Sequence, residues 1–233
     1  MGARDDDAVP ESVVALVPAA GRGERLGGDT PKALVPLAGE ALLVHAVRAL
    51  TASHSVDRVV VAAPAELLDE VRALIPGVIV VAGGATRVAS VAAALASAGE
   101  ADVVLVHDAA RPLASAALID RVAAAVLDGA GAVIPVMPVI DTVKRVDAAG
   151  RVLGTVDRAD LRTVQTPQGF RRSVLVEAHA RAADDGEDAT DDAGLVERIG
   201  GEVVTVPGEE QAFKITTPAD LSRAEDLLGA VRS

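Results

Sequence analysis

The stretch VVALVPAAGRGERLGGDTPK, residues 13–32, sets the fold class expected of this chain. Its first five residues form an aliphatic run that ends at Pro18, which predicts a buried strand opening into a loop. The loop continues to Lys32 and carries four glycines. In a parallel α/β sheet such a loop lies at the carboxyl ends of the strands, where ligands bind.

Strand and helix patterns alternate along the rest of the first half of the chain. Aliphatic runs predict strands at 59–62, 78–81, 103–106 and 132–136, and the segments between them predict helices at 42–50, 64–75, 87–98 and 115–127. Such alternation requires crossover connections. The expected class is therefore α/β and Rossmann-like, with a mostly parallel twisted sheet and helices on both faces.

The regular alternation of predicted strands and helices stops after Pro138. Two short β-prone runs, 142–146 and 152–156, flank a four-residue loop and predict a β-hairpin. We expect residues 139–160 to form an arm that projects from the sheet. Helices near 171–183 and 193–199, a strand at 203–206 and a last helix beginning at Thr217-Pro218 complete the prediction.

The length and composition limit the classes of function. A chain of 233 residues suits one compact unit, so we expect a single domain at 13–233 after a disordered or flexible lead at 1–12. The absence of cysteine removes disulfides and thiolate chemistry, and a net charge of -12 argues against nucleic acid as a partner. No apolar stretch predicts a signal peptide or a membrane span, so we expect a cytoplasmic protein without a membrane partner.

The loop after the first predicted strand is a candidate phosphate site. Small residues let backbone N–H groups approach a triphosphate, and Arg25 and Lys32 would neutralise charge that builds on phosphoryl oxygens. The segment lacks the Gly-Lys-Ser/Thr of a P-loop, and Leu26 stands where a dinucleotide-binding loop needs its third glycine. The alternative from spacing alone is a surface loop without a ligand.

Two further loops follow predicted strands. Gly84, the second of two glycines before a helix, would admit a flat base with Ser90 as a polar contact, or would only form a tight turn with a helix cap. Asp108 and Arg111 would bind hydroxyls, a metal-bound phosphate or each other, and the alternative is a structural ion pair. We assign no chemistry to His107 beside them.

The predicted arm carries basic residues at both of its ends. Lys144 and Arg158 lie on the hairpin and its flank, and Lys214 follows much later in the chain. This arrangement indicates an anion clamp, although exposed hairpins often carry charge without binding anything.

Taken in order, these motifs resemble those of the 2-C-methyl-D-erythritol 4-phosphate cytidylyltransferase family, over about residues 13–230. The matching segments are PAAG at 18–21 with Arg25 and PK at 31–32, VHDAARP at 106–112, DTVK at 141–144, TVDR at 155–158, QTPQ at 165–168, TDD at 190–192 and KIT at 214–216. The resemblance implies a nucleotidyltransferase fold and an enzyme of isoprenoid precursor biosynthesis. Such an enzyme transfers CMP from CTP to a small sugar-alcohol phosphate and releases pyrophosphate, with Mg²⁺ bound to the triphosphate.

The resemblance also implies roles for single residues and a homodimer with exchanged arms, and it leaves the metal ligands unidentified. The implied catalytic residues are Arg25, Lys32, Arg158 and Lys214. The implied CTP-binding residues are Pro18, Ala19, Ala20, Gly21, Gly23, Arg25, Lys32, Gly84, Arg87 and Ser90. The implied acceptor-binding residues are Asp108, Arg111, Thr142, Arg158, Thr166, Thr190 and Lys214, of which Thr142 and Arg158 would serve the partner subunit's site.

The chain departs from the family pattern at one position, and two other functions remain as alternatives. The family often has an acid after the paired glycines, where this chain has Ala85, so base selectivity would depend on backbone groups and Ser90. A ribitol-5-phosphate cytidylyltransferase resembles the same motif set. A non-catalytic nucleotide-binding module is an alternative of another class, and the basic residues at positions 25, 32, 158 and 214 count against it.

Overall fold

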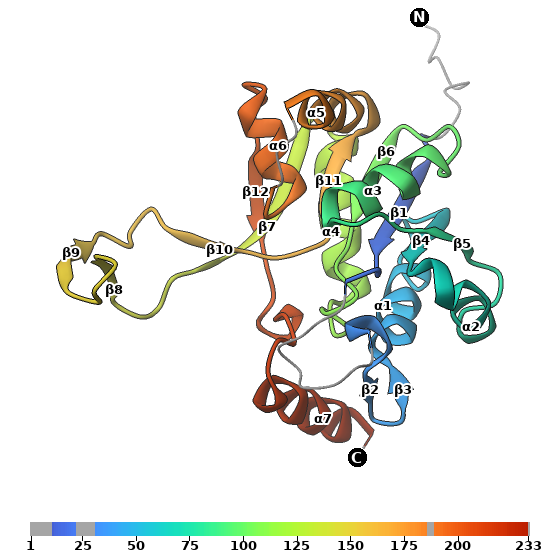
Figure 1. The fold of residues 1–233 in the computed structure, drawn as a ribbon, viewed down its shortest axis with the longest axis horizontal. Helices are drawn as coiled ribbons and strands as arrows, with labels where there is room; N and C mark the ends of the chain where they lie inside the picture. Colours follow the sequence, from blue (N-terminus) through green and yellow to red (C-terminus); the bar gives the residue numbers. More distant parts are fainter. Residues whose placement is uncertain (1–10, 22–30, 186–188, 233) are drawn as a thin grey trace, which may run out of the picture.

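A computed structural model describes residues 11–21, 31–185 and 189–232 (Figure 1). The main sheet of these residues comprises β1 (Val13–Pro18), β4 (Arg58–Ala63), β5 (Ile79–Ala82), β6 (Val103–Val106), β7 (Ala132–Pro138), β10 (Arg162–Val164), β11 (Gln168–Arg171) and β12 (Val204–Pro207). The strand order is β10-β7-β11-β6-β1-β4-β5, and β12 pairs with β7. The pairs β6–β1, β1–β4, β4–β5 and β7–β12 are parallel, which confirms the mostly parallel sheet.

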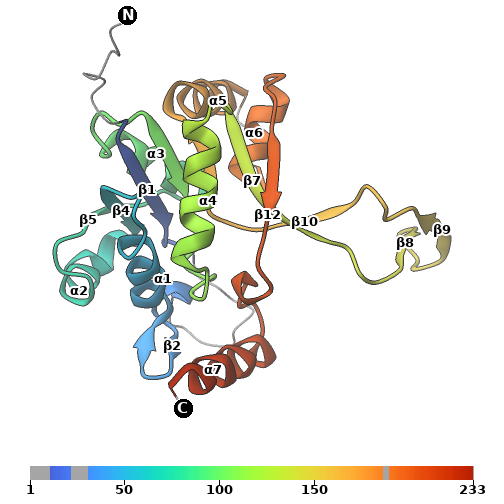
Figure 2. The same ribbon diagram turned by 180° about the vertical axis from the view of Figure 1, so that it is seen from behind.

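Helices cover both faces of this sheet, as Figures 1 and 2 show from opposite sides. The helices are α1 (Leu42–Thr51), α2 (Leu68–Leu74), α3 (Arg87–Ala96), α4 (Ala116–Leu127), α5 (Arg172–Asp185), α6 (Asp192–Arg198) and α7 (Pro218–Arg232). Val13, Ala15 and Val17 of β1 pack in one buried cluster with α1, α2 and α4. Val14 and Leu16 pack in another with α3, α5 and α6. The alternation of side chains along a strand thus divides the core into two layers.

The predicted arm is present and extends away from the sheet (Figure 1). Its strands β8 (Val143–Val146) and β9 (Val152–Val156) form a separate antiparallel pair. Ile140, Val152 and Leu153 are 78%, 62% and 63% exposed. The arm therefore carries large apolar side chains that the rest of the described structure does not bury.

The last helix begins as its sequence predicts. The hydroxyl of Thr217 accepts a hydrogen bond from the backbone N–H of Asp220 at 3.2 Å. The carboxylate of Asp220 in turn accepts from the backbone N–H groups of Thr216 and Thr217, and these bonds lower its pKa to about 2. The reciprocal bonds satisfy N–H groups that a helix start otherwise leaves unpaired.

Several elements differ from the expectation. The predicted helix at 64–75 begins with a 3₁₀ turn, η3 (Ala65–Leu67), and only then becomes α2. Strands β10 and β11 and the short hairpin of β2 (Pro36–Leu37) and β3 (Glu40–Ala41) were not predicted.

The unpredicted strand β11 lies inside the sheet between β7 and β6, antiparallel to both. Its Gly169 faces α4, where an added Cβ would lie 2.7 Å from Cγ1 of Val122 and 2.9 Å from Cγ2 of Val126. A residue without a side chain gives no alternation in the sequence, which is why the pattern missed this strand.

Replacing Gly169 by alanine should therefore lower the free energy of unfolding by about 1–3 kcal/mol, because α4 must move to admit the methyl group. Urea denaturation of the two proteins measures this. Gly131→Ala is the matched control, since its added Cβ would meet only Cγ2 of Val174 at 3.7 Å, an ordinary contact. Equal stability of the two variants would contradict the packing account.

Candidate active site

A cleft of about 220 Å³ lies where the parallel strands β1 and β6 end. Its lining residues are Pro18, Ala19, Gly21, Lys32, Ala33, Arg87, Asp108, Ala109, Ala110 and Lys214. They come from four separate parts of the chain, which the topology brings to one edge of the sheet. The cleft therefore occupies the place expected of a ligand site in this fold class.

A second cavity of about 100 Å³ adjoins the cleft. It is lined by Pro18, Ala20, Gly21, Gly84, Ala85, Thr86, Arg87 and Ser90. Pro18, Gly21 and Arg87 line both spaces. Arg87 thus stands where the two meet.

The turn before α3 needs its two glycines for close packing. A Cβ on Gly83 would lie 2.6 Å from Cβ of Ala20, and one on Gly84 would lie 2.4 Å from Cβ of Ala89. The Ser90 hydroxyl donates to the carbonyl of Thr86 at 2.9 Å and accepts from the N–H of Gly84 at 3.1 Å. The glycines therefore let this turn lie against the first loop, and Ser90 braces it.

The carboxylate of Asp108 is the centre of charge in the cleft. Its Oδ2 lies 2.8 Å from Nζ of Lys214, and its Oδ1 lies 3.5 Å from Nε of Arg87. Burial alone would raise the pKa of Asp108, but Arg87 and Lys214 hold that pKa below its ordinary value. Asp108 is therefore ionised at neutral pH, and both cations are oriented by it.

Arg111 forms no ion pair with Asp108, because its guanidinium hydrogen-bonds backbone carbonyls instead. Its Nη1 donates to the carbonyl of Ala212 at 2.8 Å, and its Nη2 donates to that of Val164 at 3.0 Å. Burial lowers the pKa of Arg111. In the described residues, Arg111 ties the Asp108 loop to the segments on either side of it.

His107 has a structural function that the sequence did not reveal. Because a carbonyl only accepts, Nε2–H of His107 donates to that of Arg111 at 3.2 Å, which leaves Nδ1 to accept from Thr166 at 3.1 Å. The Thr166 hydroxyl also accepts from the N–H of Asp108 at 3.0 Å. This chain of bonds fixes the loop that carries Asp108. Burial lowers the pKa of His107 to about 4, so the ring is neutral at pH 7.

The other predicted site residues lie elsewhere or outside the described residues. Thr142 and Arg158 are exposed on the arm and do not line the cleft. Thr190 is exposed just before α6. Gly23 and Arg25 belong to the segment 22–30, which lies outside the described residues.

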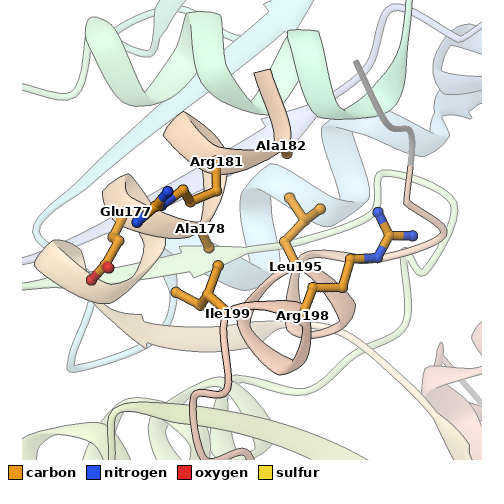
Figure 3. A pocket seen from close by; sticks show the side chains of 7 residues that line it. All are labelled: Glu177, Ala178, Arg181, Ala182, Leu195, Arg198 and Ile199. Atoms are coloured by element: carbon orange, nitrogen blue, oxygen red, sulfur yellow. The ribbon is translucent and has the colours of Figure 1, made fainter. Parts of the chain in front are cut away.

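A further cavity of about 270 Å³ lies between α5 and α6 (Figure 3). Glu177, Arg181 and Arg198 surround an apolar floor there. Its lining comes from the two helices and Ile199 after them, and from no loop at a strand end. The cleft with its cluster of charges at the strand ends is therefore the better candidate for the active site.

Known proteins resemble this chain over nearly its whole length. The family model described as IspD, 2-C-methyl-D-erythritol 4-phosphate cytidylyltransferase, matches residues 13–230. The chain belongs to this family. No described helix of this cytidylyltransferase family member has the length and apolar character needed to cross a bilayer.

Named relatives cover most of the chain. A 2-C-methyl-D-erythritol 4-phosphate cytidylyltransferase of Frankia casuarinae is 59% identical over 93% of this chain and 81% of its own. One from Saccharopolyspora erythraea is 58% identical over 93% of this chain and 99% of its own. The crystal structure of the Thermus thermophilus enzyme is 42% identical, covers 93% of this chain and 98% of its own, and superposes with a TM-score of 0.77.

The neutral state of His107 gives a pH prediction for the cytidylyltransferase fold. The pKa of His107 is about 4 in the folded protein and 6.5 in a model peptide, so the unfolded chain binds more protons between these values. The stability that neutral His107 contributes is complete above pH 6.5 and is lost as pH falls toward 4. Urea unfolding at pH 7, 6 and 5 should show this loss as a falling free energy of unfolding. The His107→Asn variant should show a smaller change of that free energy with pH. An identical slope in both proteins would contradict it.

Proposed function

We propose that the cleft at the strand ends binds the triphosphate of CTP and the acceptor phosphate, and that its lysines and arginines carry the reaction. By its family, the chain is a cytidylyltransferase that transfers CMP from CTP to 2-C-methyl-D-erythritol 4-phosphate in isoprenoid precursor biosynthesis. The observation that carries the assignment of the site is the pairing of Arg87 and Lys214 with one buried carboxylate, Asp108, in a cleft at the strand ends that Lys32 also lines.

The reaction requires charge compensation rather than a general base. An oxygen of the acceptor phosphate attacks the α-phosphorus of CTP, the bond from that phosphorus to the β-phosphate bridge breaks, and pyrophosphate leaves with the electron pair. The second pKa of a phosphate ester is about 6, so the nucleophile is already largely dianionic at neutral pH. Lys32, with Arg25, would stabilise the charge that develops at the α-phosphate, and Lys214 would hold the acceptor phosphate.

The smaller cavity beside the cleft suits the base of the nucleotide. Gly84 and Ala85 form part of its wall, and the turn that carries them is held rigid by Ser90. With alanine at position 85, recognition of the cytosine edge would depend on backbone N–H and C=O groups. Pro18, Ala19, Ala20 and Gly21 would follow the triphosphate from there toward Lys32.

The described residues fit a Mg²⁺ ion that arrives with the nucleotide. Among them no group of three or more His, Cys, Asp or Glu side chains is placed to hold a metal. Asp108 is the acid that lines the cleft. Its two oxygens face Lys214 and Arg87, so substrate phosphates and water, which Mg²⁺ commonly keeps as ligands, would supply most of the coordination. When bound, the ion would offset charge on the triphosphate.

The arm supports a homodimer in which each subunit completes the site of the other. Thr142 and Arg158 are exposed on the arm and absent from the lining of their own cleft. Apolar Ile140 and Leu153 are exposed on the same arm. We therefore propose that Thr142 and Arg158 reach the acceptor phosphate in the partner's cleft. The residues that would order the acceptor side of that cleft or contact the acceptor are Asp108, Arg111, Thr166 and Thr190.

We also propose that residues 13–233 act as one catalytic domain and that the enzyme is cytoplasmic, as the cysteine-free sequence favours.

Pyrophosphate release by the purified protein with Mg²⁺ tests the activity. We expect release with CTP and methylerythritol phosphate, and at least tenfold less with ribitol 5-phosphate or with another triphosphate, because a polar site rejects a substrate that leaves its groups unpaired. Preference for ribitol 5-phosphate would move the enzyme to the sister reaction.

Lys32→Ala should lower kcat by about 100-fold, because one cation that stabilises transition-state charge is lost. Arg72→Ala is the control, since Arg72 is an exposed cation of α2 paired with Asp69 at 2.8 Å. Circular dichroism checks the fold of both variants. Normal turnover in Lys32→Ala would remove this lysine from the mechanism.

Mixing two inactive variants tests the exchange of arms. Lys32→Ala spoils the cleft and Arg158→Ala spoils the arm, so a mixed dimer would hold one intact site. Co-refolding the two should restore about a quarter of wild-type activity if subunits pair at random. If the mixture stays as inactive as its components, Arg158 does not act across the dimer.

A further inference from the structure

A second buried carboxylate, that of Asp192, lies behind the cleft. Asp192 opens α6 and is 0% exposed. Its Oδ2 lies 2.6 Å from Nη1 of Arg87, and its Oδ1 lies 2.9 Å from Nε2 of His179. The backbone N–H of Asp192 donates to Oε1 of Gln168 at 3.1 Å. A buried charge with no water around it must be paired and hydrogen-bonded, and these contacts satisfy that requirement.

His179 supplies one of these bonds from α5. A carboxylate only accepts hydrogen bonds, so Nε2 of His179 carries the proton that bridges to Asp192. The imidazole is buried, and its Nδ1 has no partner among the described residues. Within the described structure, the hydrogen bond to Asp192 is thus the polar contact of the His179 ring.

Asp192 and Asp108 hold Arg87 from two directions. Nη1 of Arg87 meets Asp192 at 2.6 Å, while Nε of Arg87 lies 3.5 Å from Asp108. Burial would lower the pKa of Arg87, but the two carboxylates raise it above its ordinary value. Two contacts on different edges of a planar guanidinium fix its plane as well as its position.

We propose that His179 and Asp192 are positioning residues of the nucleotide site, acting through Arg87. Arg87 lines both the cleft and the adjoining cavity, so a tilt of its guanidinium alters the wall on which the nucleotide rests. His179 restricts the Asp192 carboxylate, and that carboxylate restricts Arg87. This inference rests on the proposed function, which places CTP in these two spaces.

Three substitutions of His179 distinguish the effect of its hydrogen bond to Asp192 from the effect of the space that its side chain fills. His179→Gln places an amide N–H near the position of Nε2 and should keep the dissociation constant for CTP within about twofold of wild type. His179→Leu fills the space without a donor, and His179→Asn is too short to reach Asp192. Both should weaken CTP binding about five- to tenfold, the effect expected for the loss of one ordinary hydrogen bond.

The control is His45→Leu, which removes another buried histidine whose Nε2 bonds the carbonyl of Leu37 at 2.9 Å. It should bind CTP as wild type does. Calorimetry of CTP binding with Mg²⁺ measures the dissociation constants, and steady-state kinetics should show a raised KM for CTP with kcat changed less than twofold.

Several outcomes would overturn the inference. Wild-type affinity in the leucine and asparagine variants would do so, as would failure of the glutamine variant to rescue binding or equal weakening in His45→Leu. If the leucine variant does not fold, the asparagine and glutamine pair decides the question. Wild-type protein that binds CTP but releases no pyrophosphate would contradict the proposed function, while the affinities would still test the positioning.

Discussion

The interaction on which the site depends is the pairing of the Asp108 carboxylate with Lys214 and Arg87. Asp108 follows the central strand β6, Lys214 belongs to the segment before α7, and Arg87 begins α3. One charge therefore joins three parts of the chain that are far apart in sequence. The bonds among His107, Thr166 and the Asp108 backbone keep that charge in place, because a buried carboxylate that shifts away from its partners carries a large desolvation cost.

The charged side chains at the cleft are paired with one another, although the whole chain carries a net charge of -12. Asp108 and Asp192 face Lys214 and Arg87 in direct pairs. The acids orient these cations, while Lys32 comes to the same cleft from the first loop. Preorganised cations cost little reorganisation when a phosphoryl group is transferred, and this is the main source of rate acceleration in such reactions.

Much of the fold followed from local patterns, whereas the deeper contacts of the site did not. Alternating strand and helix signals gave the parallel sheet, and the loops after β1 and β6 pointed to the cleft. Strand β11 stayed hidden because Gly169 packs against α4 by lacking a side chain. Asp192 appeared only as part of the TDD motif and His179 gave no signal, since only tertiary packing brings α5 and α6 to Arg87. Sequence likewise did not show that Arg111 turns to the carbonyls of Ala212 and Val164.

A crystal structure with CTP, Mg²⁺ and an unreactive acceptor analogue would show whether the cleft at the strand ends binds both substrates. We expect the base beside Gly84, the α-phosphate against Lys32, and the acceptor phosphate between Lys214 and the Arg158 that the other protomer's arm carries. Nucleotide bound in the cavity between α5 and α6, or a triphosphate that makes no contact with Lys32, would contradict this expectation.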